Sequence, residues 1–277
     1  MLQMNPAPQT PDHTILPAGN APETIPAPGI PQRFKTLDGR ALKMIAVITM
    51  LIDHIGAALY YTLSELFGFA DPSVRDQLYD VLRAIGRTAF PIFAFFLVEG
   101  FILTRSRFRY AVRLLIFAFL SEIPFQLAFD AEFHFGFKNV IFTLLFGLIT
   151  IGCLEHIGVR RLLYSSAETT VAGVFGKVIL SSVTVSLMMF LAWAFDSDYD
   201  YRGVLLIVIF YLFRDMRLLA LVLGYLSFLW EPWSFVGFLL LLTYNGKRGR
   251  QHKYFFYVFY PAHLMLIWLL RYRLAGF

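Results

Sequence analysis

The sequence has only one cysteine, Cys153, among its 277 residues. A single thiol excludes an intramolecular disulfide and a metal site built from several cysteines. Charged residues are also scarce, at 16% of the chain, compared with about 25% in a typical soluble domain. The patterns GxxxxGK, G-x-G-x-x-G, HExxH and G-x-S-x-G do not occur. Their absence excludes the common soluble nucleotide-binding, metalloprotease and hydrolase motifs, and we expect no metal cofactor.

What remains is strongly apolar. Hydrophobic residues make up 58% of the chain, phenylalanine alone contributes 30 residues, and the mean hydropathy is +0.63. We expect apolar segments at residues 41–60, 83–104, 110–129, 139–157, 171–195, 201–213, 217–230, 233–244 and 254–272. Crossing a bilayer takes about 20 helical residues, so the sixth to eighth segments are short. The sequence therefore predicts an all-α, polytopic transmembrane helical bundle of about nine spans, some of them short or broken.

The positive charges lie in short connections between the apolar segments. The formal net charge is +5 and the isoelectric point is near 9.3, values that could also indicate nucleic-acid binding. The basic connections, however, alternate with mainly acidic ones along the chain. Because Lys and Arg accumulate in cytoplasmic loops, this alternation predicts a multi-pass protein of the plasma (inner) membrane with a cytoplasmic N-terminus and no nucleic-acid partner.

The first 36 residues differ from the rest in composition. They hold eight of the 13 prolines: Pro6, Pro8, Pro11, Pro17, Pro22, Pro26, Pro28 and Pro31. A segment this rich in proline and poor in aromatics cannot bury a core. We therefore expect a disordered cytoplasmic tail at 1–36 and a multi-pass membrane domain at 37–277.

Asp53 and His54 stand side by side inside the first apolar segment. An ionisable pair at membrane depth costs several kcal/mol, by the lower estimates of about 2.5–3.5 kcal/mol for one charged group. Such a pair persists only when it faces a protein interior or a water-filled cavity. Adjacent helical residues point about 100° apart, so we expect Asp53 to hold an arginine of the second span while His54 faces a cavity.

Other polar residues are predicted to lie in the middle or outer half of the spans. Two of them, Arg83 and Arg87, are four residues apart and therefore on one helix face. The other polar residues of this set are Glu122, Asn139 and His263. These residues could also have a purely structural role. Arginine side chains often extend to the membrane interface, and a lone histidine is usually a hydrogen-bonded core residue. Together they indicate a polar cavity in the outer half of the membrane.

Lys43 lies 11 residues before His54, about three helical turns. The two side chains therefore share nearly the same helix face, about 16 Å apart. A cation at the inner mouth and an imidazole farther out suit a long anionic substrate held between them. This spacing makes Lys43 a candidate for binding such a donor.

Several separate blocks, spread over about residues 37–265, resemble the TraX family. They are Lys43-x-x-Ala46 leading to Asp53-His54-x-Gly56, Arg83-x-x-Gly86-Arg87-x-x-Phe90-Pro91-Ile92-Phe93 with Glu99-Gly100, Tyr110-x-x-Arg113-Leu114, Ser121-Glu122-Ile123-Pro124-Phe125, Asn139-Val140 and Tyr260-Pro261-x-His263. That family is linked to N-acetylation of conjugative pilin and is similar to transmembrane acyltransferases. The resemblance implies transfer of an acyl group, most simply acetyl, from cytosolic acetyl-CoA or another acyl-CoA to an outer-face acceptor.

The resemblance also implies roles for the polar residues. His54 would be the general base or a transient acyl carrier, because an imidazole can take a proton at neutral pH. Arg83 and Arg87 would anchor Asp53 or stabilise an oxyanion. Glu122, Asn139 and His263 would contact the acceptor, and Lys43 the phosphates of CoA. The acceptor would be an amine or hydroxyl group of a protein N-terminus, a glycan or a lipid.

Two other functions fit the same residues. Asp53, His54 and Glu122 could form the relay of a proton-coupled membrane transporter. The chain could also be a non-enzymatic membrane component of a pilus or secretion assembly. The first alternative predicts proton flux without consumption of acyl-CoA, and the second predicts tolerance of His54 substitution.

Overall fold

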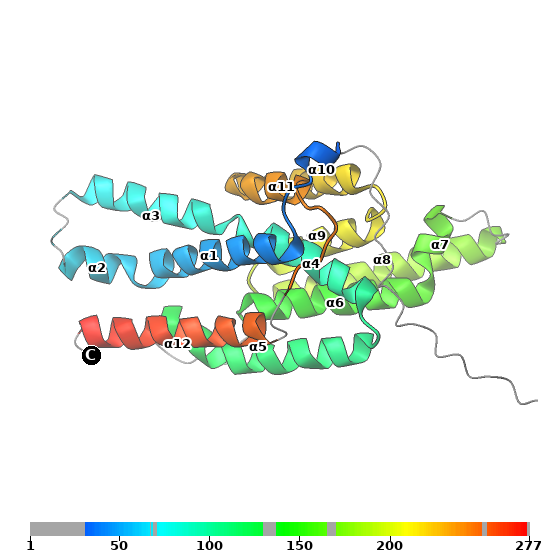
Figure 1. Cartoon of the computed structure of the whole chain (residues 1–277). Coiled ribbons are helices and arrows are strands. Elements are labelled where there is room, and N and C mark those ends of the chain that lie inside the picture. The colour runs from blue at the N-terminus through cyan, green and yellow to red at the C-terminus, as the bar shows by residue number, and fades with distance from the viewer. Residues whose placement is uncertain are drawn as a thin grey trace, which may run out of the picture.

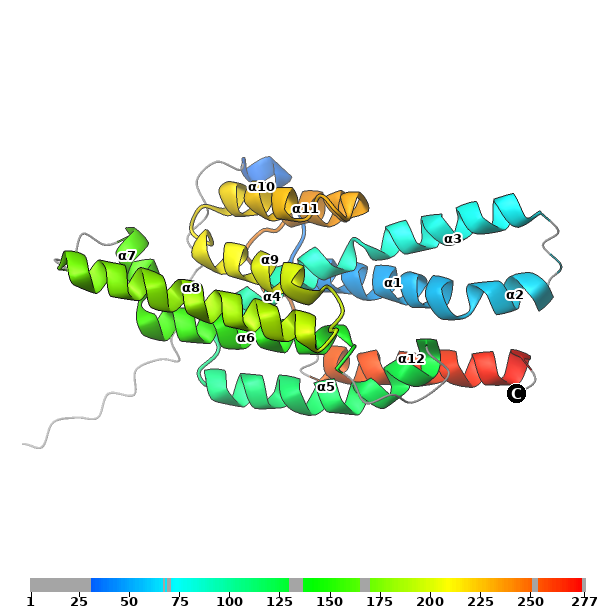
Figure 2. The same ribbon diagram turned by 180° about the vertical axis from the view of Figure 1, so that it is seen from behind.

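The structure, a computed structural model, describes residues 31–66, 68, 71–129, 137–164, 170–250 and 254–275. Residues 1–30 of the predicted tail lie outside the described residues. The elements are η1 (Gln32–Phe34), α1 (Gly39–Ala58), α2 (Tyr60–Leu66), α3 (Pro72–Gly86), α4 (Ala89–Leu103), α5 (Arg107–Phe129), α6 (Val140–Ile157), α7 (Val159–Tyr164), α8 (Val171–Ala194), α9 (Asp200–Leu212), α10 (Arg217–Ser227), η2 (Pro232–Ser234), α11 (Phe235–Leu242) and α12 (Phe255–Ala275). Figures 1 and 2 show them as an elongated helical bundle.

Each of the nine expected apolar segments coincides with a helix, so the predicted fold class is confirmed. Six helical stretches are long and apolar enough to cross a membrane: Gly39–Ala58, Pro72–Leu103, Arg107–Phe129, Val140–Ile157, Val171–Ala194 and Phe255–Leu274. The sixth to eighth segments form α9, α10 and α11, of 13, 11 and 8 residues. A helix of 13 residues reaches about 20 Å, which is too short for an ordinary bilayer core.

Residues 61–82, expected as an acidic connection, are largely helical instead. They contribute to α2 and α3, and α3 runs directly toward α4. The start of α3 is set by Asp71, whose side chain accepts a hydrogen bond from the Ser73 N–H, and by Pro72 in the first turn. This combination is a common helix start. The acidic residues therefore lie on the surface of helix α3. Arg83 lies in the last turn of the same helix.

The chain turns at Arg87 and Thr88 before α4 begins at Ala89. Pro91 follows four residues after Arg87 and has no N–H to bond the Arg87 carbonyl, so it favours a break at this point. The expectation that Arg83 and Arg87 lie one turn apart on one helix face agrees with the structure, because the Arg87 N–H donates to the Arg83 carbonyl at 3.2 Å and Arg87 keeps helical dihedral angles. Arg87 caps the C-terminal end of α3.

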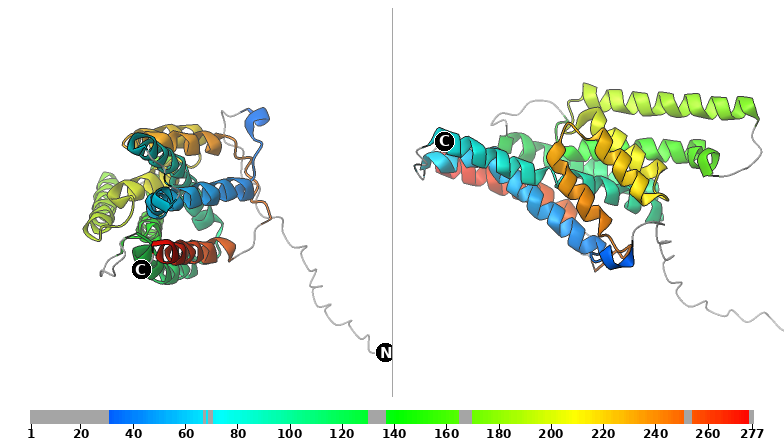
Figure 3. Two further views of the ribbon diagram at one scale, coloured as in Figure 1. Left: turned by 90° about the vertical axis from the view of Figure 1, so that its left-hand side faces the viewer. Right: turned by 90° about the horizontal axis from the view of Figure 1, so that it is seen from above.

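Helix α1 is central to the half of the bundle that carries the polar residues. It runs between α3 and α12, as the end-on view shows (Figure 3, left). Helix α12 packs in turn along α5, while α6, α8 and α9 form the other half of the bundle. Two neighbouring residues of α1 can therefore face two different helices.

The alternation of charge along the chain corresponds to two ends of the bundle. At the basic end, the segment before α1 meets the one after α11, because the Gly39 N–H donates to the Lys247 carbonyl at 2.8 Å. Arg107 pairs with Glu155, and Arg160 with Asp215, so the other basic connections meet there too. Mainly acidic connections occupy the opposite end, which carries α2 and the start of α3 (Figure 1).

Candidate functional site

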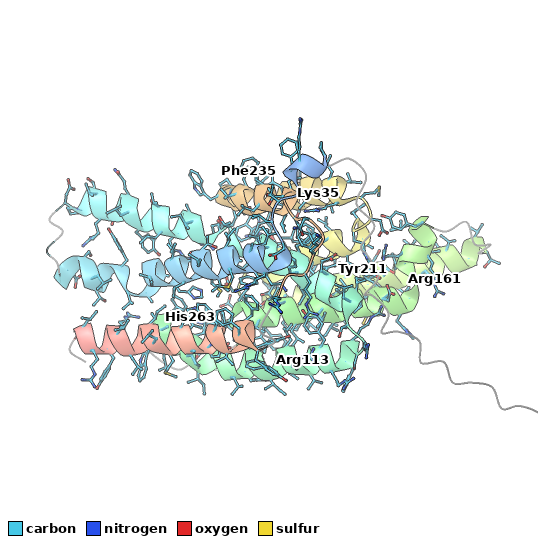
Figure 4. All side chains as sticks on the ribbon, in the orientation of Figure 1. Lys35, Arg113, Arg161, Tyr211, Phe235 and His263 are labelled. Carbon is cyan, nitrogen blue, oxygen red and sulfur yellow. The ribbon has the colours of Figure 1, made fainter. Side chains whose placement is uncertain are left out.

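Asp53 and His54 point from α1 toward different helices. The Arg83 Nη1 group of α3 donates to Asp53 Oδ2 at 2.7 Å, so the expected pair of Asp53 with an arginine of the second span is present. His54 lies on the other side of α1, where it contacts His263 of α12. Figure 4 labels His263 on α12, beside α1. The chain thus brings together two histidines that are 209 residues apart.

The two imidazoles meet edge to edge. His54 Nδ1 and His263 Nε2 are 2.7 Å apart, the ring planes differ by 5°, and the ring centroids are 5.0 Å apart. Both side chains are buried, with 8% and 5% of their surfaces exposed. Phe129 and Tyr260 pack their rings edge-on against His54 at centroid distances of 5.3 and 6.0 Å. The aromatic surroundings hold the pair in one plane.

The hydrogen bonds assign the protons when both rings are neutral. His263 Nδ1 lies 2.7 Å from the carbonyl oxygen of Phe259, which can only accept, so this nitrogen carries a proton. His263 Nε2 is then an acceptor, and His54 Nδ1 donates to it. Nε2 of His54 is left with its lone pair, and it makes no hydrogen bond within the described parts of the chain. The arrangement is that of an oriented base with a second imidazole behind it.

A cavity of about 460 Å³ approaches this pair from the basic end. Its cationic lining residues are Lys43, Arg105, Arg113 and Arg248, and Glu99 is the carboxylate among the residues that line it. Figure 4 labels Arg113 on α5. The side chain of Lys43 lies over the rings of Phe96 and Phe256, at 4.7 and 5.7 Å from their centroids. The mouth therefore combines positive charge with aromatic surfaces.

Two helical stripes lead along the cavity to the histidines. On α1 the lining residues are Lys43, Val47 and Met50, and the next position on that face is His54. On α12 they include Phe256 and Tyr260, and the next position is His263. The imidazole pair therefore lies directly beyond the deep end of the cavity, one helical turn from its last lining residues.

The second arginine has a partner of its own. Arg87 Nε lies 3.2 Å from Glu231 Oε2, an acidic residue between α10 and η2. Arg87 also bonds the hydroxyl of Tyr199, in the turn before α9. Arg83 and Arg87 therefore act on different carboxylates, and their four-residue spacing did not reveal this. Both ion pairs are partly buried, where they fix α3 against its neighbours.

Glu122 and Asn139 are joined in a dense network between α5 and α6. The Glu122 carboxylate accepts bonds from Gln126, from the backbone of Lys138 and from both nitrogens of Asn139, at 2.6 to 3.2 Å. Asn139 also donates to the Ala118 carbonyl and caps α6. With their bonding capacity used inside the protein, these residues have the geometry of a structural clamp between α5 and α6. Their role in binding an acceptor stays a prediction.

The connection between α8 and α9 carries a partly buried carboxyl group, Asp198, near the two arginines. Burial raises the pKa of Asp198 from 3.8 to about 6, although the positive charges of Arg87 and Arg83 oppose the shift. Because the pKa is higher in the folded state, the carboxyl destabilises the fold only where it is ionised. The destabilisation is absent below about pH 4 and complete above about pH 6.

Asp198→Asn is therefore expected to raise the melting temperature in detergent at pH 7.5. The difference from wild type should shrink steadily as the pH is lowered to 5, because wild-type Asp198 then becomes protonated. Asp196→Asn, at an exposed position of the same connection, is the matched control and should have little effect. An equal gain from Asp198→Asn at both pH values would contradict the assignment.

Sequence reasoning missed several of these residues. Neither Glu231 nor Asp198 was singled out in the sequence analysis, because nothing local indicates that they lie near the arginines at the end of α3. Tyr260 belongs to one of the blocks that resemble the TraX family, but no function was predicted for it. Its spacing of three residues before His263 places both on one helix face, and that signal was available in the sequence.

Comparisons with known proteins agree with the motifs. A family model described as TraX protein matches residues 38–271. Over 251 residues, the chain is 30% identical to the probable fimbrial assembly protein FimC, serogroup H1, of Dichelobacter nodosus; the match covers 82% of this chain and 92% of that protein. No solved structure matches the chain. On the extent of these matches, the protein belongs to the TraX family.

Proposed function

We propose that the protein is a membrane acyltransferase that moves an acyl group, most simply acetyl, from an acyl-CoA to an amine or hydroxyl acceptor. The observation that carries this proposal is the His54–His263 pair at the end of a cavity with a cationic mouth. An oriented base next to a binding site for a long anionic molecule is what acyl transfer from CoA requires.

His54 is the general base in this proposal. Its Nε2 lone pair removes the proton of the acceptor as the acceptor nitrogen or oxygen attacks the thioester carbon. The positive charge that develops on His54 is shared through the Nδ1–Nε2 bond with His263, whose second nitrogen donates to a carbonyl oxygen. His263 is therefore a positioning residue that stabilises the imidazolium form.

The donor enters from the basic end of the bundle, which we assign to the cytoplasm by the positive-inside rule. The four cations of the cavity mouth meet the CoA phosphates, and Lys43 lies on the aromatic part of the wall. The acceptor approaches from the opposite end, near the Asp53–Arg83 and Arg87–Glu231 ion pairs. With that orientation, the protein lies in the plasma membrane with its N-terminus in the cytoplasm.

The direct test is release of free thiol from acetyl-CoA by purified protein in nanodiscs. Labelled acetyl groups are followed in parallel onto membrane extracts that supply the acceptor. Thiol release that saturates with acetyl-CoA and transfers label supports the proposal. An intact, monodisperse protein that releases no thiol and transfers no label with such extracts would overturn it. Proton flux without loss of acetyl-CoA would identify a transporter instead.

Lys43→Ala is expected to raise KM for acetyl-CoA about tenfold and to change kcat less than about threefold. The lost contact is between two groups that do not react, so it contributes equally to ground and transition states. Steady-state thiol release over a range of donor concentrations measures both constants. Lys177→Ala, on lipid-facing α8, is the matched control. A fall in kcat at constant KM would contradict a role for Lys43 in donor binding.

The second candidate is a non-enzymatic component of a pilus or fimbria assembly. It is favoured by the similarity to the Dichelobacter nodosus relative, which is named a probable fimbrial assembly protein. In that case the protein co-purifies with an assembly partner, and His54→Ala leaves assembly unchanged. An acyltransferase acting on an assembly subunit would instead lose its effect on assembly with the same substitution.

A further inference from the structure

The hydroxyl group of Tyr260 is a buried polar group on the cavity wall whose hydrogen-bonding capacity is not used by a neighbouring side chain. Tyr260 is 5% exposed and lines the cavity. Its ring packs edge-on against both imidazoles, with centroids 6.0 Å from His54 and 5.6 Å from His263. Within the described residues its hydroxyl oxygen has no hydrogen-bond partner of normal geometry. A buried hydroxyl in this state needs an explanation, and on the wall of a cavity a bound ligand can supply the missing partner.

A second donor lies beside this hydroxyl. The backbone N–H of Val140 faces the Tyr260 oxygen, and Val140 also lines the cavity. Val140 is the first residue of α6, directly after the capping residue Asn139, so its N–H has no partner within the helix. Helix α6 has 18 residues, and the positive end of its dipole lies at this point.

We propose that the Tyr260 hydroxyl and the Val140 N–H form the oxyanion site for the thioester carbonyl of the acyl donor. This inference rests on the proposed function and adds the groups that stabilise its transition state. The site lies where the cavity comes nearest to the two histidines, so a carbonyl bound there is within reach of an acceptor held at His54.

The reaction at this site balances as a single acyl transfer. The acceptor lone pair forms a bond to the thioester carbon, and the π electrons of the carbonyl move to oxygen. Tyr260 O–H and Val140 N–H donate hydrogen bonds to that oxygen. When the C=O bond re-forms, the C–S bond breaks, and the thiolate leaves with the proton that His54 took from the acceptor.

The two arginines are less suited to this task. Arg83 is bound to Asp53 and Arg87 to Glu231, and neither is among the residues that line the cavity. Stabilising an oxyanion would require them to give up these carboxylates. The Tyr260 and Val140 donors are present on the cavity wall without such a rearrangement.

Tyr260→Phe tests the hydroxyl while keeping the aromatic ring against the histidines. We expect kcat for thiol release to fall about 100-fold, as it does when one oxyanion donor is lost elsewhere. KM and the affinity for a non-hydrolysable thioether analogue of acetyl-CoA should change less than about threefold. Tyr272→Phe, at an exposed position of the same helix, is the matched control. A purely structural role for Tyr260 would lower analogue binding and melting temperature together with kcat.

Val140→Pro tests the N–H with little strain. Proline is favoured at the first helical position, and the preceding Asn139 already has the extended ψ of 152° that proline requires. A comparable fall in kcat, with analogue binding retained, supports the inference. Tyr260→Phe at wild-type kcat, beside an inactive His54→Ala, overturns the oxyanion site but leaves the proposed function standing. A wild-type protein that releases no thiol overturns both.

Discussion

Replacing His54 with alanine is expected to lower thiol release from acetyl-CoA by about 10³-fold, within the range attributed to general acid–base catalysis. The variant loses the Nε2 lone pair that takes the acceptor proton. It should keep KM for the donor nearly unchanged, because His54 lies beyond the deep end of the cavity rather than at its mouth. The measurement is steady-state thiol release in nanodiscs, with label transfer to membrane extracts as the second readout.

Two variants define how this loss is interpreted. His263→Ala keeps the base but removes the partner that orients it, so it should lose less activity than His54→Ala. His156→Ala removes an exposed imidazole at the end of α6 and should behave as wild type. A His54→Ala protein that transfers acetyl at the wild-type rate would eliminate the mechanism and favour the assembly component.

Gly86→Ala is expected to lower the free energy of unfolding by about 3 kcal/mol, the upper end of typical overpacking costs. A Cβ at this position would overlap the Cβ, Cγ and Oδ1 atoms of Asp53. Turning the carboxylate away does not relieve the overlap, because the Asp53 Cβ is fixed to the backbone of α1. Helices α1 and α3 must therefore separate, which also stretches the bond between Arg83 and Asp53.

Thermal melting in detergent measures this effect, with the yield of monodisperse protein as a second readout. Gly176→Ala is the matched control, because no atom lies within 4 Å of the added Cβ on α8. Alanine there should be neutral or stabilising by up to about 1 kcal/mol through helix propensity. If Gly86→Ala melts at the wild-type temperature, the close contact of α1 with α3 is not part of the stable fold.

The membrane helices could be predicted from the sequence because crossing a bilayer demands long apolar runs that composition reveals directly. Helix α3 was missed because it is amphipathic and acidic, so it looked like a polar connection. Its start was nevertheless encoded in Asp71 and Pro72, an N-cap residue followed by a proline in the first turn. The turn after Arg87 was likewise signalled by Pro91.

The site was predictable only in part. Adjacent residues of a helix point in different directions, so the division between Asp53 and His54 follows from helix geometry. The partner of His54 cannot be derived from helix geometry, because His263 is 209 residues away along the chain. The position of His263 depends on how α12 packs against α1. A functional role of Tyr260 was not predicted for another reason. Tyrosine is common at membrane interfaces, and Tyr260 stands out only by its burial on the cavity wall next to both histidines.

The short hairpin of α10 and α11 has a consequence for the lipids around the protein. Its first helix has 11 residues and spans only about 16 Å, roughly half the hydrocarbon thickness of an ordinary bilayer. Several of its large apolar side chains face outward, including Leu218, Val222, Leu226 and Trp233. Lipids on this side must compress to cover them, and each ångström of mismatch costs a fraction of a kcal/mol. We therefore expect the hairpin to couple the protein to membrane thickness, with a preference for short-chain or fluid lipid over thick, ordered lipid.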